Sequence, residues 1–458
     1  MIRGFKSLES EFKPMLGLAI PLALAELGWM GMGIVDTMMV GRVRESAVAI
    51  GAVSLGSVLF FAVAIFGAGL LLGLDTLVSH SYGAGDIEDC HHSLVHGIYI
   101  SFALTPLLMG LIWLCIPLLR SSGIQPAVLR EAIPYLKATT WSTLPLLLFF
   151  AFRRYLQGMN LVKPVMFALV SANLVNLVGN WMLVYGHLGA PAMGVVGSGW
   201  ATCISRIYMA LLLLGYILYF EYRYKTGLLQ TSLQPNPQRV MRLLGLGLPA
   251  AMQLALEVGV FAVATALIAK LDPVSLAAHQ IALNSASLTY MVPLGISSAA
   301  AVRVGQALGR HDSHAASLSG WTALLLGAAF MSCSAAAFLL VPRYIVRMYT
   351  PNAAVIQMGI TLLAVAAFFQ LFDGLQVVAT GALRGAGDTR TPMLCTLAAY
   401  WVLGLPLGYY LCFRWSWGAA GLWIGLCIAL ILIGIVLLFV WWRTVRRWSY
   451  LRSSEPNA

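Results

Sequence analysis

The sequence predicts an all-α polytopic membrane protein whose twelve transmembrane helices form two pseudo-symmetric six-helix lobes. Three observations predict it: the composition, the spacing of the apolar runs and an internal repeat. Of 458 residues, 60% are apolar or aromatic and only 10% are charged, whereas a soluble domain carries about 25% charged residues. So few charges cannot cover a water-exposed surface around so much apolar mass, and this argues against a soluble multidomain enzyme.

The apolar runs have the length that a bilayer demands, since a spanning helix needs roughly 20 mainly apolar residues. Charges, glycine, proline or polar clusters bound twelve such runs: 13–40, 49–78, 92–117, 131–152, 162–185, 194–219, 241–269, 276–303, 315–341, 353–380, 391–412 and 416–441. The first run continues well past Ala25, where a signal peptide would end, so we expect it to remain as a helix.

Several function classes find no support in the composition. The net charge is +11, but the basic residues are spread thinly and the last cluster adjoins tryptophans after an apolar run, as in a helix that leaves a membrane. We therefore expect no nucleic-acid partner. The seven cysteines form no CxxC pair, so neither disulfides nor a zinc site is predicted. A GxxxxGK[ST] loop for ATP phosphates is also absent.

The two halves of the sequence resemble each other. The segment that ends at Pro21 reads like the segment that ends at Pro249, and Leu383-Arg-Gly385 repeats Leu156-Gln-Gly158. Because further matches follow in the same order, we infer a duplication. The polar stretch 221–239 then links lobes 1–220 and 240–442, with a tail at 443–458. An even number of spans gives both lobes the same orientation, with a natural binding site in the cleft between them.

The distribution of Lys and Arg predicts the orientation. The segments on the side of the N-terminus carry the excess, including Arg153 and Arg154, which we place in the loop after the run 131–152. Since basic residues accumulate on the cytoplasmic side, both termini should be cytoplasmic.

Five acids lie inside the predicted spans, where an ionised group costs about 2.5–3.5 kcal/mol on insertion scales. They are Glu26, Asp36, Asp75, Glu257 and Asp373, and the only basic residue that we place as deep is Arg206. This excess of acids indicates a pathway for cations or protons. The alternative is that Ser, Thr or Arg neighbours neutralise an acid purely for packing, and for Glu26 and Asp75 the two interpretations have equal weight.

Comparison of the two halves shows which of these acids are shared by the repeat. Asp36, Glu257 and Asp373 correspond to apolar residues in the other half, so the shared scaffold demands none of them. Polar side chains accompany the acids at helical spacing, as supporting or substrate-lining candidates: Gln370, Gln280 with Asn284, and Asn176 with Asn180. Ordinary interhelical hydrogen bonds are the alternative. Tyr290 and Phe369 are candidates for cation–π contacts with a cationic ligand, unless they face lipid.

Five segments together carry a resemblance to the MATE (multidrug and toxic compound extrusion) family of the MOP superfamily, nearest its NorM-type branch. These segments are Ile34–Gly41, Leu256–Gly259, Ala277–Gln280 with Asn284, Val302–Gly305, and Asp373–Val378 with Leu383–Gly385. The resemblance implies a monomeric carrier in the inner (plasma) membrane that exports cationic, amphipathic drugs and dyes in exchange for Na⁺ or H⁺. It implies no enzymatic activity and no cofactor other than the coupling ion.

Site residues carry over from the same resemblance. Asp36 matches the first-lobe acid that is linked to proton coupling, with Asn176 and Asn180 as its hydrogen-bond partners. Glu257 and Asp373 match the second-lobe acids that are linked to cation binding, and a Na⁺ ion there would be the only metal. A lipid-linked oligosaccharide flippase of the same superfamily is the alternative, but such a carrier needs a basic cavity and the buried charge here is mainly acidic.

Overall fold

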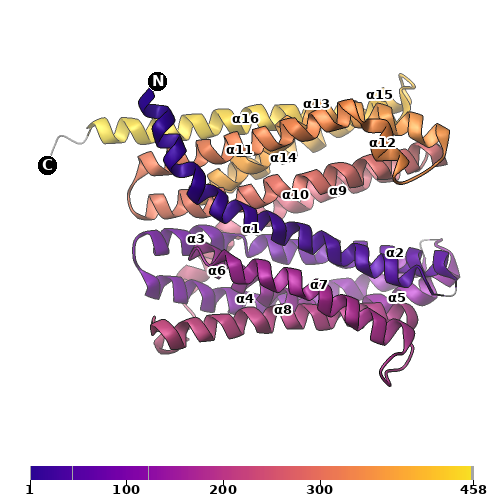
Figure 1. The fold of residues 1–458 in the computed structure, drawn as a ribbon, viewed down its shortest axis with the longest axis horizontal. Coiled ribbons are helices and arrows are strands. Elements are labelled where there is room, and N and C mark those ends of the chain that lie inside the picture. The colour runs from indigo at the N-terminus through magenta and orange to yellow at the C-terminus, as the bar shows by residue number, and fades with distance from the viewer. Residues whose placement is uncertain (1, 44, 122, 455–458) are drawn as a thin grey trace. The chain divides into compact units, whose positions relative to one another are not determined.

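The computed structural model describes residues 2–43, 45–121 and 123–454, and within these ranges it consists of helices and short turns without a strand (Figure 1). The first half contains α1 (Ile2–Val40), α2 (Ser46–Leu70), α3 (Gly73–Gly83), α4 (Ile87–Arg120), α5 (Pro126–Thr140), α6 (Thr143–Gly158), α7 (Val162–Tyr185), α8 (Gly194–Tyr224) and η1 (Leu228–Gln230). The second half contains α9 (Pro237–Ile268), α10 (Pro273–Gly309), α11 (Ser313–Leu340), α12 (Pro342–Arg347), α13 (Ala353–Gly385), α14 (Arg390–Thr396), η2 (Leu397–Gly404), α15 (Leu405–Phe413) and α16 (Gly418–Ser454).

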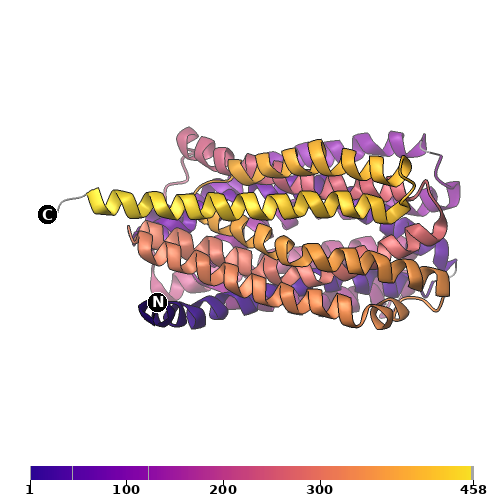
Figure 2. The same cartoon turned by 90° about the horizontal axis from the view of Figure 1, so that it is seen from above.

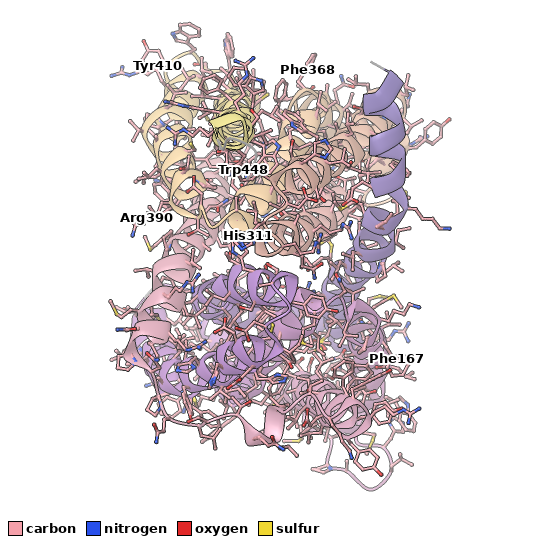
Figure 3. All side chains as sticks on the ribbon, turned by 90° about the vertical axis from the view of Figure 1, so that its left-hand side faces the viewer. Phe167, His311, Phe368, Arg390, Tyr410 and Trp448 are labelled. Atoms are coloured by element: carbon pink, nitrogen blue, oxygen red, sulfur yellow. The ribbon has the colours of Figure 1, made fainter. Side chains whose placement is uncertain are left out.

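The helices confirm the predicted all-α membrane fold. In the described part of the chain, 11 helical segments are long and apolar enough to cross a bilayer. Many of their large apolar side chains are exposed, among them Phe167 and Phe368, which are labelled in Figure 3. Exposed apolar side chains on spanning helices are in their preferred solvent when lipid surrounds them.

The remaining predicted run, 131–152, falls on two shorter helices, α5 and α6, which meet at Trp141 and Ser142. Hydroxyl groups cluster at this junction, and each donates to a carbonyl three or four residues earlier: Thr139, Thr140, Ser142 and Thr143. Such side-chain bonds compete with the helical hydrogen bonds and bend a helix. The prediction of one continuous helix over 131–152 is therefore wrong, because the chain breaks at Trp141 and Ser142.

The chain divides into two compact units. Residues 24–251 form the N-terminal unit, and residues 1–23 together with 252–458 form the C-terminal unit. The predicted linker 221–239 lies within the first of these, and the division into lobes 1–220 and 240–442 stays a prediction. The predicted tail continues α16 as far as Ser454, while residues 455–458 lie outside the described residues. Figure 2 shows α16 running along the other helices of its own unit toward the C-terminus.

The unit boundaries fall inside α1 and α9, shortly after Pro21 and Pro249. The start of α1 therefore belongs to the C-terminal unit, and the start of α9 belongs to the N-terminal unit. A proline inside a helix removes a backbone hydrogen bond and bends the helix. In both helices the change from one unit to the other thus comes two residues after a proline, the residue type that most readily bends a helix.

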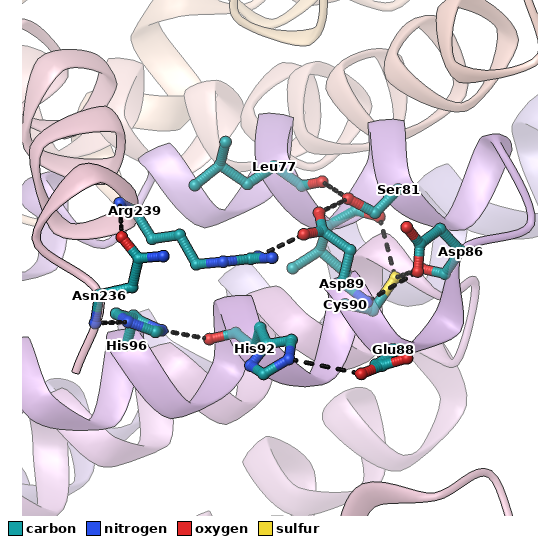
Figure 4. A network of polar contacts seen from close by, with 11 residues as sticks. Leu77, Ser81, Asp86, Glu88, Asp89, Cys90, His92, His96, Asn236 and Arg239 are labelled. Atoms are coloured by element: carbon teal, nitrogen blue, oxygen red, sulfur yellow. Dashed lines mark hydrogen bonds and ion pairs between the residues drawn. The ribbon is translucent and has the colours of Figure 1, made fainter. Parts of the chain in front are cut away.

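Polar contacts hold the start of α9 within the N-terminal unit (Figure 4). Arg239 forms an ion pair with Asp89 at the start of α4, and Asp89 also accepts a hydrogen bond from Ser81. Nε2 of His96 accepts a 2.9 Å hydrogen bond from the backbone N–H of Asn236. Because Nδ1 of the same ring donates to the carbonyl of His92 at 2.7 Å, the imidazole is fixed as one neutral tautomer.

An ion pair also holds the start of α1 within the C-terminal unit. Nε of Arg303, on α10, lies 2.8 Å from Oε1 of Glu11, and the hydroxyl of Ser319 on α11 donates to the same oxygen. Close packing joins α10 to α13 in this unit. A Cβ atom added to Gly381 or Gly385 would overlap the backbone of Ser297 or Ala301, so this glycine pair lets two helix backbones touch.

Candidate functional site

Asp36 lies on α1 of the N-terminal unit and is 5% exposed. Its Oδ1 accepts hydrogen bonds from Nδ2 of Asn176 at 2.9 Å and of Asn180 at 2.7 Å. Its Oδ2 accepts one from Oγ1 of Thr202 on α8, at 2.8 Å. The four-residue spacing places both asparagines on one face of α7, toward α1. Thr202 completes the cluster, and nothing in the sequence distinguishes this threonine from the others in apolar runs.

The hydroxyl of Thr202 has a second acceptor, the carbonyl of Ser198, at 3.1 Å. A hydroxyl carries one proton, so it can donate either to Asp36 or to this carbonyl. All three contacts to Asp36 are donors and therefore suit the ionised carboxylate. A protonated Asp36 would donate to Oγ1 of Thr202, and the Thr202 hydroxyl would then rotate and donate to the carbonyl of Ser198. The cluster can therefore accommodate both protonation states of Asp36.

Arg206 lies one helical turn after Thr202 and is buried. Its Nη1 donates to Oγ of Ser142 at 2.6 Å, and its guanidinium lies 4.4 Å from the ring centroid of Phe60. No carboxylate of the described residues comes within ion-pair distance, although Asp36 interacts with it electrostatically at longer range. Arg206 thus anchors α8 to the break between α5 and α6.

Glu26 and Asp75 each have a buried basic partner on α6. Glu26 forms an ion pair with Arg153, and Oδ2 of Asp75 lies 3.3 Å from Nη1 of Arg154. Both arginines are buried. The placement of Arg153 and Arg154 in a loop, with Arg206 as the only deep basic residue, was therefore wrong, because α6 continues to Gly158 and faces the core. These pairs favour a packing role for the two acids.

Glu257 on α9 and Asp373 on α13 lie in the C-terminal unit, 9% and 8% exposed. They are close enough to interact electrostatically. Oη of Tyr290, on α10, donates to Oε1 of Glu257 at 3.4 Å, whereas Asp373 accepts no hydrogen bond from the described residues. No Lys or Arg among those residues pairs with either acid. Two neighbouring carboxylates without a counter-ion would attract a cation or a proton.

The side chains around these acids leave buried hydrogen-bonding positions open. Nε2 of Gln370 donates to Thr289 at 2.8 Å, but its Oε1 has no partner. The amide oxygen of Gln376 and the hydroxyl of Tyr400 are also buried without a partner among the described residues, while the amide nitrogen of Gln376 lies near Glu257. Buried polar groups are nearly always hydrogen-bonded, so these atoms are the ones that water or an ion would satisfy.

The other predicted residues of this unit make contacts that do not involve the two acids. Gln280 and Asn284 are exposed and, among the described residues, hydrogen-bond to neither acid. Phe369 is buried and stacks on Trp423, with ring centroids 5.9 Å apart. Tyr290 is therefore the predicted aromatic residue that reaches the carboxylates directly.

His279, next to Gln280, has a structural role that the sequence did not reveal. Its Nδ1 accepts a 2.9 Å hydrogen bond from the indole N–H of Trp423, so the proton of the neutral ring is on Nε2. Nε2 lies 2.8 Å from Oγ1 of Thr265 on α9. The ring therefore ties α10 to α16 and to the helix that carries Glu257.

The MatE family model matches the chain twice, at residues 21–182 and 249–410. The chain belongs to the MATE family. The two matches begin at Pro21 and Pro249, the residues at which the internal repeat aligns. One model that matches both halves supports the duplication inferred from the sequence.

Relatives and solved structures of the MATE family align over nearly the whole chain. A probable multidrug resistance protein NorM of Mesorhizobium japonicum is 34% identical, covering 95% of this chain and 94% of its own. The multidrug resistance protein NorM of Vibrio cholerae is 35% identical, covering 92% and 93%. The structure of a eukaryotic MATE transporter superposes with a TM-score of 0.86 at 20% identity, covering 96% of this chain and 99% of the other.

Proposed function

We propose that this MATE-family protein is a secondary active multidrug efflux transporter that exchanges cationic amphipathic compounds for Na⁺ or H⁺ by alternating access. One observation carries the proposal. Asp36, Glu257 and Asp373 are buried within spanning helices, and no Lys or Arg of the described residues lies within ion-pair distance of them. The names of the NorM relatives support drug export.

Exchange follows from the cost of burying charge. An ionised carboxylate in the hydrocarbon region is unfavourable until a proton, a metal cation or a cationic drug neutralises it. If the ion and the drug prefer opposite states of the transporter, or compete for the same acids, binding of one releases the other. A ligand shifts such an equilibrium only by its difference in affinity for the two states.

The same proposal includes the location, orientation and partners of the protein. The chain is a multi-pass membrane protein, and we place it in the inner (plasma) membrane as a monomer with both termini cytoplasmic. Its partners are the bilayer and small cationic drugs or dyes, without nucleic acid, and the coupling ion is the only cofactor. The flippase alternative is less favoured, because the buried arginines Arg153 and Arg154 are already paired with acids.

Transport in proteoliposomes tests this function. We expect export of ethidium to depend on an imposed Na⁺ or pH gradient and to stop when the gradient is dissipated. Liposomes with the Asp36→Asn variant serve as the control for leak. Ethidium flux that ignores both gradients, or that equals the control, would contradict the proposal.

A further inference from the structure

Tyr400 lies in η2, a short π-helical segment between α14 and α15. Its side chain is fully buried, and its hydroxyl has no hydrogen-bond partner among the described residues. A phenol can both donate and accept a hydrogen bond, so leaving both possibilities unused inside a protein is unfavourable. The proposed exchange does not yet assign Tyr400 a role.

Packing against α16 accounts for the π-helical segment. A Cβ atom added to Gly404 would lie 2.6 Å from Cβ of Ala429, and one added to Gly408 would lie 2.9 Å from the carbonyl oxygen of Leu422. The two helices therefore approach closely at these glycines. Pro406 lacks a backbone N–H and cannot continue the regular hydrogen-bond pattern into η2. Short π-helical turns of this kind occur frequently at functional sites.

This segment directs two consecutive side chains at α9, on both sides of Glu257. Nε1 of Trp401 donates to the carbonyl of Leu256 at 3.0 Å. The ring of Tyr400 packs edge-on against Phe261, with centroids 6.1 Å apart. Glu257 lies between these two contacts in the sequence, so η2 fixes the part of α9 that carries the carboxylate.

Tyr400 also interacts electrostatically with both acids of the C-terminal unit, Glu257 and Asp373. Gln376, one turn after Asp373, lies near Glu257 and has a buried amide oxygen without a partner among the described residues. Two carboxylates, a phenol oxygen and an amide oxygen thus gather without a basic residue of the described chain. Oxygen atoms of these types are the ligands that hard cations bind.

We propose that Tyr400 supplies a neutral oxygen ligand to a sodium ion held by Glu257 and Asp373. This inference rests on the proposed ion exchange at these two acids and adds to it a ligand, contributed by η2. The coordination would use the hydroxyl that is otherwise unpartnered. A purely structural Tyr400 would instead contribute only its ring.

The variant Tyr400→Phe separates these roles because it removes the oxygen and keeps the ring. Thermal unfolding of the purified protein in detergent is measured while NaCl replaces choline chloride at constant ionic strength. We expect Na⁺ to stabilise the wild type, and the half-saturating concentration to rise about tenfold in Tyr400→Phe, as for the loss of one contact with a charged group. Tyr410→Phe, at an exposed position of α15, is the matched control and should behave as the wild type.

The unfolding temperature in the absence of Na⁺ provides a second test. Without Na⁺, Tyr400→Phe should unfold at the same temperature as the wild type or higher, since a buried hydroxyl without a partner has been removed. An equal Na⁺ dependence of wild type and variant, or a wild type that Na⁺ does not stabilise, would overturn the inference. If the wild type instead showed no gradient-driven ethidium flux, the proposed function would be contradicted. The failure of the inference and the failure of the proposed function are therefore distinguishable.

Discussion

The hydroxyl of Thr202 donates a 2.8 Å hydrogen bond to Oδ2 of Asp36 and lies 3.1 Å from the carbonyl of Ser198. This arrangement lets the cluster exist with Asp36 ionised or neutral. An asparagine at position 36 imitates the neutral state, since its Nδ2 can donate to Thr202 while the hydroxyl turns to Ser198.

Asp36→Asn should therefore fold normally and fail to transport. We expect its stability to change by no more than about 1 kcal/mol, because each hydrogen-bonding group keeps a partner. Ethidium efflux should stop, because an amide cannot exchange a proton. Thr37→Val is a control, since that hydroxyl donates only to the carbonyl of Gly33 in its own helix. Efflux by Asp36→Asn at the wild-type level would remove Asp36 from the mechanism.

Glu257→Gln and Asp373→Asn should also abolish efflux, without loss of stability. Each substitution removes one of two neighbouring buried charges that lack a basic partner among the described residues, so the unfolding midpoint without coupling ion should stay equal or rise. Addition of Na⁺ should then stabilise these variants less than the wild type. The measurement is thermal unfolding in detergent alongside ethidium efflux in cells. Variants that fold but export at full rate would contradict the site.

The ion pair between Glu26 and Arg153 should matter for stability more than for transport. Removing one partner leaves a buried charge unpaired, and such losses cost about 3–5 kcal/mol. We expect Glu26→Gln and Arg153→Met to be strongly destabilised singly, and the double variant to regain most of that stability and to export ethidium. The exposed pair Glu88–His92 is the control and should contribute less than about 1 kcal/mol. A stable double variant that cannot transport would instead indicate that this ion pair has a role in transport.

The ion pair between Asp89 and Arg239 should hold the start of α9 in place. Breaking it with Arg239→Gln should make the segment around Asn236 more accessible to protease, since the contacts of His96 with Asn236 (Figure 4) and of Tyr99 with Leu233 would then hold it without the ion pair. The exchanged pair Asp89→Arg with Arg239→Asp should restore protection. Limited proteolysis of membranes checks this, with Arg223→Gln, at an exposed position of α8, as the control. Equal cleavage of wild type and Arg239→Gln would show that the ion pair does not hold this segment.

Much of the fold could be predicted because the bilayer imposes a length and a composition on every span. The run 162–185 and helix α7 coincide, and the run 194–219 lies within α8. The break at Ser142 was missed, although four hydroxyl side chains within residues 139–143 were a visible signal. For the π-helical segment at Tyr400, Pro406 was a local signal only of an irregular helix, and the close approach of α16 to Gly404 and Gly408 could not be predicted from the sequence.

The site could be predicted in part. Spacing along one helix linked Asn176 to Asn180, and the cost of buried charge selected the acids. Thr202 could not be selected, since its contact with Asp36 joins residues 166 positions apart. Arg153 was misplaced because a charged residue near the end of an apolar run reads equally well as loop or as buried helix.

The sequence by itself determined that this protein lies in a membrane, that its fold is all-α, that its two halves are duplicated and which few acids lie in its spans. These properties follow from local composition and period, which do not depend on distant contacts. Only the tertiary structure decided that Glu26 and Asp75 have arginine partners, while Asp36, Glu257 and Asp373 have none at ion-pair distance among the described residues. The physical reason is that the free energy of a buried charge depends on its distance from groups on other helices, and the packing of those helices sets that distance.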